Sequence, residues 1–379
     1  MRILFLTASL EAGGAERQLS VLARGLHVRG HDVRVLTFYD RGRLKDELVA
    51  AGVSVQSLGK SGRWDLIGLL PRLISAIRAA QPDIVHSYLT VPNIAAALIR
   101  PLLGVRVLVW GIRYADLDLA AYDRITRLTY RWQPRLARCA DLVIANSEAG
   151  RTMALREGYP AARLAVVANG IDTEYFRPDI ADRAATRAGW GLAAHARAIG
   201  VAARFDPMKD HATFLRAAAA LSATDDTLRF VCLGGGLDVQ LQALRALAGE
   251  LGIADRVFWT GPVADMAAAW RALDLCVLSS AYGEGFPNVV AEAMASGLRC
   301  AVTDVGDAAT IVGETGRVVP PRDPAALAAA CRALLDTTDG ADPRTRIVEN
   351  FGVSQLIAQS EALLTRTLAR MPGRTACAA

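Results

Sequence analysis

Residues 274–297 read DLCVLSSAYGEGFPNVVAEAMASG, and this stretch contains the structural unit that the rest of the chain repeats. An apolar run ends in two serines, a loop with two glycines follows, and small residues continue after Pro287. A short apolar run bounded by turn residues and followed by a helical segment is typical of a parallel sheet. We therefore predict a strand over 274–280, a loop over 281–286 and a helix that starts near Pro287, a residue suited to the first helical turn.

Similar apolar runs recur along the chain and alternate with longer segments of helical pattern. This alternation predicts βαβ units and a parallel sheet in each half of the chain. The runs rich in Val, Ile and Leu are 2–8, 32–38, 53–58, 83–88, 106–112, 141–147 and 164–170 in the first half, and 196–205, 228–236, 256–263, 274–280, 298–305 and 316–321 in the second.

The predicted fold class is α/β, with two Rossmann-like doubly wound domains that face each other across a cleft. A chain of 379 residues is long for one core, and the polar segment TEYFRPD (173–179) separates the two sets of strands. We predict one domain over 1–175, a second over 176–360, and a last segment over 361–379 that holds the end of a helix and a disordered tail. Ligands of such sheets bind beyond the carboxyl ends of the strands, so the cleft is the expected site.

The composition, with 52% hydrophobic and 21% charged residues, indicates a globular protein. The longest uncharged run has 16 residues (84–99), too few to span a bilayer, and the apolar run at the N-terminus is too short for a secretory signal. The six cysteines form no C-x-x-C pair, which favours a reduced, cytoplasmic compartment.

Charge is distributed unevenly between the two halves. Residues 1–175 hold 23 Lys and Arg against 16 Asp and Glu, a net of +7, whereas residues 176–379 hold 20 against 22, a net of −2. An anionic partner of the first half would account for this excess, and a membrane surface, a nucleic acid or a phosphorylated substrate each qualifies. Surface arginines without any partner are the alternative.

Two carboxylates flank the start of the helix predicted at Pro287. Glu284 lies in the loop and Glu292 lies about 1.5 turns into the helix, at ~3.6 residues per turn. The amino end of a helix binds anions, so carboxylates beside it make sense if they accept hydrogen bonds from hydroxyls on either side of a diphosphate. That arrangement describes a nucleotide-sugar site. The alternative is that Glu292 is a solvated helix residue and Glu284 a charge on a loop.

Arg204 and Lys209 follow another predicted strand and provide two cations for such a diphosphate. Together they would stabilise the charge of the leaving group without a metal ion. The alternative is a surface pair that neutralises Asp206 and Asp210. We expect no metal site, because the five histidines are scattered and the D-x-D match of Asp116 and Asp118 is too short to carry weight.

The segment 279–327 resembles the signature of the family 4 retaining glycosyltransferases, which have the GT-B fold, and it contains their Glu-x7-Glu motif. Three further segments are similar to motifs of that family, in the same order: GGAERQLSVLARGLHVRGHDV (13–33), VVANGIDTEYFRP (166–178) and VAARFDPMKDHATFLRAAA (201–219). The segments WGIRYADLDL and RFDPMKDH are closest to the polysaccharide and O-antigen assembly branch.

The resemblance implies a retaining, metal-independent hexosyltransferase that uses a nucleoside-diphosphate sugar, UDP rather than GDP, and needs no cofactor. It implies an N-terminal domain for a glycan or lipid-linked acceptor at the inner face of the membrane, and a C-terminal domain for the donor; no nucleic acid is expected. Glu284 would hold sugar hydroxyls, Glu292 the ribose, and Arg204 with Lys209 the diphosphate. Further donor-binding candidates are Gly13, Gly14, Arg113, Gly234, Val263, Gly285, Phe286, Pro287, Asn288 and Val289.

Three of these candidates, Gly13, Gly14 and Gly234, lie in glycine-rich loops after strands. Gly13 and Gly14 allow a ligand to approach the backbone where the next helix opens. The GGG run at 234–236 lacks a full G-x-G-x-x-G, since position 239 is Val, so a dinucleotide site is weakly supported.

His86 lies at the end of a predicted strand and is expected to face the cleft as a catalytic contact, with a purely structural histidine as the alternative. Many family members place a histidine after the next strand, where this chain has Arg113. Arg113 can bind a phosphate of the donor or the acceptor, but it cannot act as a base.

Five arginines of the segment 122–138 recur at helical spacing, beside a stripe that contains Leu128 and Trp132. An interfacial helix on an anionic membrane and an ordinary amphipathic helix with its apolar side on the sheet both fit, and the segment 63–78 raises the same question. For the whole chain, the alternatives to transfer are a nucleotide-sugar epimerase and a non-catalytic nucleotide-sugar-binding assembly protein.

Overall fold

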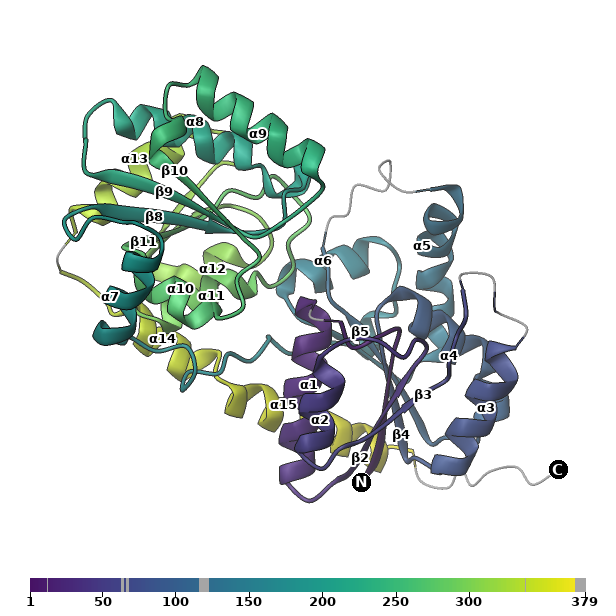
Figure 1. Ribbon diagram of the computed structural model, residues 1–379. Coiled ribbons are helices and arrows are strands. Elements are labelled where there is room, and N and C mark those ends of the chain that lie inside the picture. Colours follow the sequence, from purple (N-terminus) through teal and green to yellow (C-terminus); the bar gives the residue numbers. More distant parts are fainter. Residues whose placement is uncertain (12, 63–64, 66–67, 116–122, 338, 372–379) are drawn as a thin grey trace. The chain divides into compact units, whose positions relative to one another are not determined.

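The computed structural model describes residues 1–11, 13–62, 65, 68–115, 123–337 and 339–371. These residues divide into two compact units: unit 1 is Met1–Gly170 together with the segment from Val353 onward, and unit 2 is Ile171–Gly352. Each unit contains a parallel sheet with helices packed on both faces (Figure 1). The predicted pair of doubly wound α/β domains is therefore confirmed.

Unit 1 contains a seven-stranded sheet in the order β3-β2-β1-β4-β5-β6-β7. Its strands are β1 (Arg2–Thr7), β2 (Asp32–Thr37), β3 (Ser54–Ser57), β4 (Ile84–Tyr88), β5 (Val107–Ile112), β6 (Leu142–Ala145) and β7 (Leu164–Val166). Its helices are α1 (Gly14–Val28), α2 (Leu44–Ala50), α3 (Leu69–Ala80), α4 (Thr90–Leu103), α5 (Arg124–Leu136), η2 (Ala137–Cys139), α6 (Glu148–Arg156), η3 (Ala161–Arg163) and α15 (Val353–Ala369).

Unit 2 contains a six-stranded sheet in the order β10-β9-β8-β11-β12-β13, which repeats the order of the first six strands of unit 1. Its strands are β8 (Arg197–Ala202), β9 (Leu228–Leu233), β10 (Val257–Gly261), β11 (Leu275–Leu278), β12 (Cys300–Thr303) and β13 (Arg317–Val319). Its helices are α7 (Ile180–Gly189), η4 (Pro207–Lys209), α8 (His211–Ser222), α9 (Asp238–Glu250), η5 (Ala254–Arg256), α10 (Met266–Ala272), α11 (Asn288–Ala295), α12 (Ala308–Val312), η6 (Gly313–Thr315), α13 (Pro324–Leu335) and α14 (Pro343–Asn350).

All thirteen predicted strand segments contain an observed strand, because both faces of each sheet are covered. In β1, Leu4 and Leu6 pack into one core of unit 1, and Ile3 and Phe5 pack into the core on the opposite face. The strand order reverses between β1 and β4 in unit 1 and between β8 and β11 in unit 2. Ligands of doubly wound sheets bind at this switch point, beyond the carboxyl ends of the two strands.

The C-terminal helix differs from the sequence-based division. α15 belongs to unit 1, where it packs on α1, and the boundary lies after Gly170 rather than after residue 175. Gly25 makes this contact possible, because a Cβ at that position would lie 2.1 Å from Ile357 Cδ1. Leu364 of the same helix is fully buried in the core of unit 1. The tail predicted to be disordered lies outside the described residues from position 372 onward.

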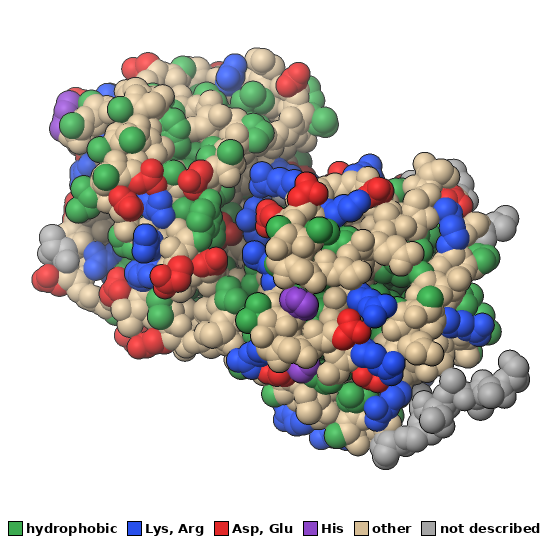
Figure 2. Space-filling model, turned by 60° about the horizontal axis from the view of Figure 1, so that its bottom comes forward, with side chains coloured by type: hydrophobic (Ala, Val, Ile, Leu, Met, Phe, Trp, Pro, Cys, Tyr) green, Lys and Arg blue, Asp and Glu red, His purple; other side chains and the backbone are tan. Residues whose placement is uncertain are grey.

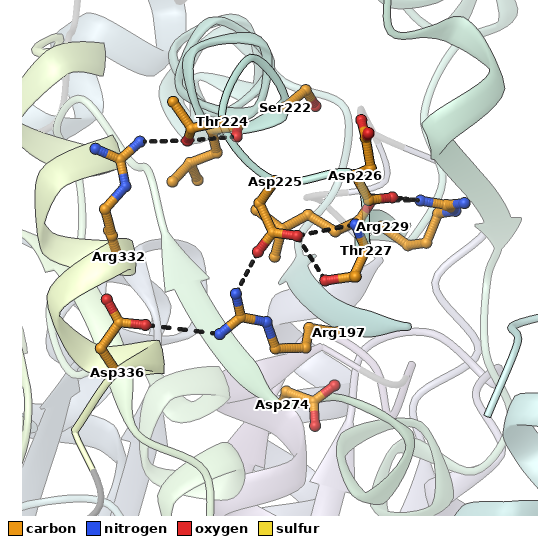
Figure 3. A network of polar contacts seen from close by, with 12 residues as sticks. Arg197, Ser222, Thr224, Asp225, Asp226, Thr227, Arg229, Asp274, Arg332 and Asp336 are labelled. Carbon is orange, nitrogen blue, oxygen red and sulfur yellow. Dashed lines mark hydrogen bonds and ion pairs between the residues drawn. The ribbon is translucent and has the colours of Figure 1, made fainter. Parts of the chain in front are cut away.

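Acidic and basic side chains are interspersed on the face shown in Figure 2. One such group lies at the amino end of the sheet in unit 2, where Arg197 forms ion pairs with Asp225 and Asp336 (Figure 3). A hydrogen bond from the Thr227 hydroxyl is the main reason that the pKa of Asp225 falls to about 2. The group lines a hollow of about 390 Å³, but its charges balance one another and it lies away from the carboxyl ends of the strands. We therefore interpret this group of charged residues as structural, since it joins the segments that carry Arg197, Asp225 and Asp336.

Candidate functional site

An ion pair joins the two loops at the switch point of unit 2. Lys209, in the loop after β8, places its Nζ 2.5 Å from Oε1 of Glu284, in the loop after β11. Ser280 donates a hydrogen bond of 2.6 Å to the same carboxylate oxygen. The side chains of Lys209 and Glu284 are only 17% and 9% exposed, so the pair is largely removed from water.

Backbone contacts fix the same two loops against each other. The hydroxyl of Ser279 donates to the Lys209 carbonyl over 2.9 Å, and the amide of Ala281 donates to the Met208 carbonyl over 2.8 Å. Sequence reasoning missed both serines. Their position directly after the apolar run of β11 was the available signal, since polar residues at strand ends are placed at the ligand edge.

The acidic residues beside Lys209 have other partners. Asp206 accepts from the Met208 amide over 2.9 Å, and Asp210 accepts from the Thr213 amide over 3.1 Å, so they cap η4 and α8. The alternative in which Arg204 and Lys209 neutralise these two aspartates is therefore wrong for Lys209. Arg204 is exposed, and no described carboxylate forms an ion pair with it.

The helix that follows Glu284 begins one residue later than predicted. Pro287 occupies the N-cap position and α11 starts at Asn288. Phe286 is buried with its ring centroid 5.5 Å from that of Phe351, which anchors the segment that enters the helix. Asn288, Val289 and Glu292 are half-buried on α11.

Gly306 packs directly against the Glu284 loop. Its φ is +58°, and a Cβ there would lie 2.5 Å from the carbonyl oxygens of Glu284 and Gly285. The next amide, of Asp307, donates to the Gly285 carbonyl over 2.9 Å. The loop after β12 thus supports the loop that carries Glu284.

The glycine run after β9 serves backbone packing. Gly234 has a φ of +134°, and a Cβ there would lie 2.2 Å from the Ala203 carbonyl oxygen. The amide of Gly234 donates to the Gly261 carbonyl over 3.0 Å. Gly234 is therefore required by the close approach of neighbouring loops. Val263, two residues beyond β10, is half-buried.

Arg113 lies at the carboxyl edge of the sheet in unit 1, directly after β5. Its guanidinium donates to the Tyr88 hydroxyl over 2.7 Å and to Oδ1 of Asn169 over 3.3 Å, and it lies 4.5 Å from the centre of the Tyr88 ring. Both hydrogen-bond partners are neutral, and within the described residues no carboxylate pairs with Arg113. Neutral partners therefore hold the guanidinium in place, and no described carboxylate compensates its positive charge.

His86 does not face the ligand edge as predicted. β4 continues to Tyr88, and the His86 ring is fully buried, 5.3 Å from the ring of Phe5 and 4.7 Å from that of Tyr88. Burial lowers the pKa of His86 well below its usual value, and the charge of Arg113 lowers it further. Contact with a substrate requires exposed surface, which the His86 ring lacks. The ring packs against Tyr88, whose hydroxyl accepts a hydrogen bond from Arg113.

The glycine pair at the start of α1 is exposed, with Gly13 as the N-cap and Gly14 as the first helical residue. A Cβ on Gly13 would lie 2.3 Å from Oε2 of Glu16, so the carboxylate of this helix reaches its own amino end. Burial raises the pKa of Glu16. An anion bound at this helix end would therefore compete with the carboxylate of Glu16.

No cluster of three or more His, Cys, Asp or Glu side chains suited to a metal ion occurs within the described residues. Asp116 and Asp118, which match the D-x-D pattern, lie outside that part of the chain. Among the described residues, the charged groups that the structure brings together at one ligand edge are thus Lys209 and Glu284.

Two family models match the chain. One is described as Glycosyltransferase Family 4 and matches residues 12–175, and the other as Glycosyl transferases group 1 and matches residues 196–337. A D-inositol 3-phosphate glycosyltransferase of Geodermatophilus obscurus is 31% identical over 86% of this chain and 78% of its own length. One of Thermobispora bispora is 29% identical over 95% and 91%.

Solved structures share the overall fold. HepE of Anabaena, determined with UDP and with UDP-glucose, has a TM-score of 0.84 and 24% identity over 97% of this chain and 100% of that chain. Sucrose-phosphate synthase of Thermosynechococcus elongatus has a TM-score of 0.79 and 21% identity over 98% and 100%.

Replacing Gly306 by alanine is expected to loosen the Glu284 loop. The new Cβ would collide with two carbonyl oxygens of that loop, so we expect faster hydrogen exchange at the amides of residues 281–287. Gly252→Ala is the matched control, because Gly252 has a similar φ of +69° but nothing within 4 Å of the added atom. Equal exchange in the two variants would contradict the proposed support by Gly306.

Proposed function

This chain belongs to the glycosyltransferases, with a family 4 module followed by a group 1 module, and we propose that it transfers a hexosyl unit from a UDP-sugar to a glycan or lipid-linked acceptor in polysaccharide assembly. The observation that carries the proposal is the Lys209–Glu284 pair at the switch point of unit 2. The complexes of HepE with UDP and UDP-glucose support the choice of nucleotide.

The pair provides both halves of a donor site. Lys209 is a mobile cation that can turn from Glu284 to a diphosphate, and exposed Arg204 adds a second cation five residues earlier. A carboxylate released from Lys209 can accept hydrogen bonds from hydroxyls of the transferred sugar. The amino end of α11, which follows directly, contributes backbone amides for a phosphate, and Glu292 is our candidate for the ribose.

We propose that transfer proceeds with retention and without a metal ion. The bond between the sugar C1 and the phosphate oxygen breaks, and its electron pair stays on the departing UDP. The acceptor oxygen bonds to C1 on the same face, and its proton passes to a phosphate oxygen of the leaving group. Lys209 and Arg204 lower the barrier because they stabilise the charge that develops on UDP.

Unit 1 is our candidate for acceptor binding. Arg113 keeps an uncompensated charge at the ligand edge, which suits an oxyanion such as a phosphate. The relatives named for D-inositol 3-phosphate support an acceptor that carries phosphate.

Lys209→Ala tests the donor site. We expect kcat/KM for UDP-glucose, measured as UDP release, to fall by about 10²–10³-fold, the usual loss when one charge-stabilising group is removed. Lys45→Ala is the control, because Lys45 also forms an ion pair, with Nζ 2.6 Å from Asp40 Oδ1, but lies on the surface of unit 1. Undiminished turnover by the Lys209 variant would remove the diphosphate assignment.

The stereochemistry and metal requirement can be read in one experiment. Proton NMR of the product formed from an α-linked UDP-sugar should show the α anomer, and EDTA should leave the rate unchanged. A β-linked product would refute retention, and loss of activity that Mg²⁺ or Mn²⁺ restores would refute the metal-independent step.

Arg113→Met tests which substrate carries the phosphate that Arg113 binds. Removing this charge should raise the KM for that substrate at least tenfold, since charge-assisted bonds to phosphate are the stronger ones. Steady-state kinetics with the two substrates varied in turn identifies it, and Arg113→Lys should recover part of the loss. If neither KM changes, Arg113 has only a structural role.

A further inference from the structure

Two apolar residues of α5, Leu128 and Trp132, face outward, whereas Leu136 of the same helix is half-buried against the core. Leu128 and Trp132 are 56% and 51% exposed, whereas Gln133 on the same helix is fully buried. α3, which belongs to the other segment with this sequence pattern, behaves in the opposite way: Leu73 and Ile77 are fully buried on the sheet. The ordinary amphipathic arrangement therefore holds for the described part of α3, and on α5 it does not hold for Leu128 and Trp132.

The neighbouring helix α4 extends this apolar surface. Leu98 and Leu102, one turn apart, are 60% and 51% exposed. α4 packs against α5, and a hollow of about 350 Å³ beside them is lined by Leu98 of α4 and by Leu136, one turn after Trp132. Of the exposed apolar residues, Leu98 lines this hollow, and Arg138 after α5 lines it as well.

Five arginines lie on the same segment as Leu128 and Trp132. All five are exposed, and none forms an ion pair with an acidic side chain of the described residues. The guanidinium of Arg135 lies 5.0 Å from the centre of the Trp132 ring. Some exposed arginines elsewhere in the same unit form ion pairs, such as Arg72 with Asp65 and Arg34 with Asp32. The five are Arg124, Arg127, Arg131, Arg135 and Arg138.

We propose that these side chains form a membrane-binding face for an anionic lipid bilayer; the face comprises Leu98 and Leu102 of α4, Leu128 and Trp132 of α5, and the five arginines. Exposed apolar residues rimmed by cations match a bilayer surface, where Leu and Trp enter the acyl boundary and arginines meet lipid phosphates. No helix within the described ranges is long and apolar enough to cross a bilayer, so the face would hold the protein on the surface. The proposal does not depend on the transfer chemistry of unit 2.

Cosedimentation of the full chain with vesicles tests the face. Binding to phosphatidylglycerol vesicles should exceed binding to phosphatidylcholine vesicles, and it should weaken as salt increases. The double variant Arg127→Gln, Arg131→Gln should lower the partition coefficient by roughly fivefold for each arginine. Leu128→Ser with Trp132→Ser should lower it at least tenfold, because both side chains lose their insertion into the acyl boundary.

Matched controls come from unit 2. Leu237→Ser with Val239→Ser removes two side chains that are 67% and 71% exposed, and Arg245→Gln removes one exposed arginine of α9. These variants should bind vesicles like the unchanged protein, and circular dichroism with UDP-glucose turnover shows that every variant is folded. Equal losses in the controls, or binding that ignores lipid charge, would overturn the proposal. Self-association that is abolished by the Leu128 and Trp132 changes would assign the face to a second copy instead.

Discussion

The contact between Lys209 and Glu284 is the constraint on which the functional edge of unit 2 depends. Two opposite charges that are this poorly hydrated cost free energy to bury, and a pair of apolar side chains would often join the loops equally well. The ion pair lies at the carboxyl edge of the sheet, where both charges are also candidates for ligand binding. In the proposed donor site, a diphosphate would take over the partnership with Lys209, and sugar hydroxyls would take over the partnership with Glu284. The ion pair keeps both side chains ordered in the absence of a ligand.

The supporting contacts follow from the topology. β8 and β11 are adjacent because the strand order reverses between them, so their loops meet although they lie about seventy residues apart in the chain. Ser280 fixes the carboxylate, and Gly306 allows the loop after β12 to approach where any other residue would collide. Unit 1 uses the same strand order, but Arg113 at its edge is held by a hydroxyl and an amide oxygen. One edge thus presents an ion pair, and the other presents a cation that no described carboxylate compensates.

The sequence was sufficient to predict the strands and the kinds of charged residue at the candidate site. It was not sufficient where the position of a residue depends on packing between segments that are distant in the chain. Periodicity locates strands such as β11, because a strand covered on both faces is apolar throughout. It does not show that α15 returns to unit 1, since the apolar stripe of a helix does not name the surface that covers it. His86 was misplaced for a related reason: it lies inside the strand rather than at its end, and aromatic neighbours from β1 and β4 cover the ring. The Ser280 contact depends on a loop conformation that no residue pattern specifies.

The comparison of α3 with α5 shows that helical spacing of apolar residues does not determine whether those residues are buried. Both segments combine apolar residues at helical spacing with arginines, yet α3 buries Leu73 while α5 exposes Trp132. The difference lies in which side of each helix the neighbouring elements take up. On α5 the buried side includes Gln133, whose side-chain oxygen accepts from the Tyr114 hydroxyl over 3.1 Å, while its side-chain nitrogen is buried without a hydrogen-bond partner among the described residues. The aromatic ring of Trp132 on the same helix is exposed. Exposed apolar surface of this kind suits a partner that covers it, and the excess of seven positive charges in residues 1–175 supports the anionic bilayer proposed for that role.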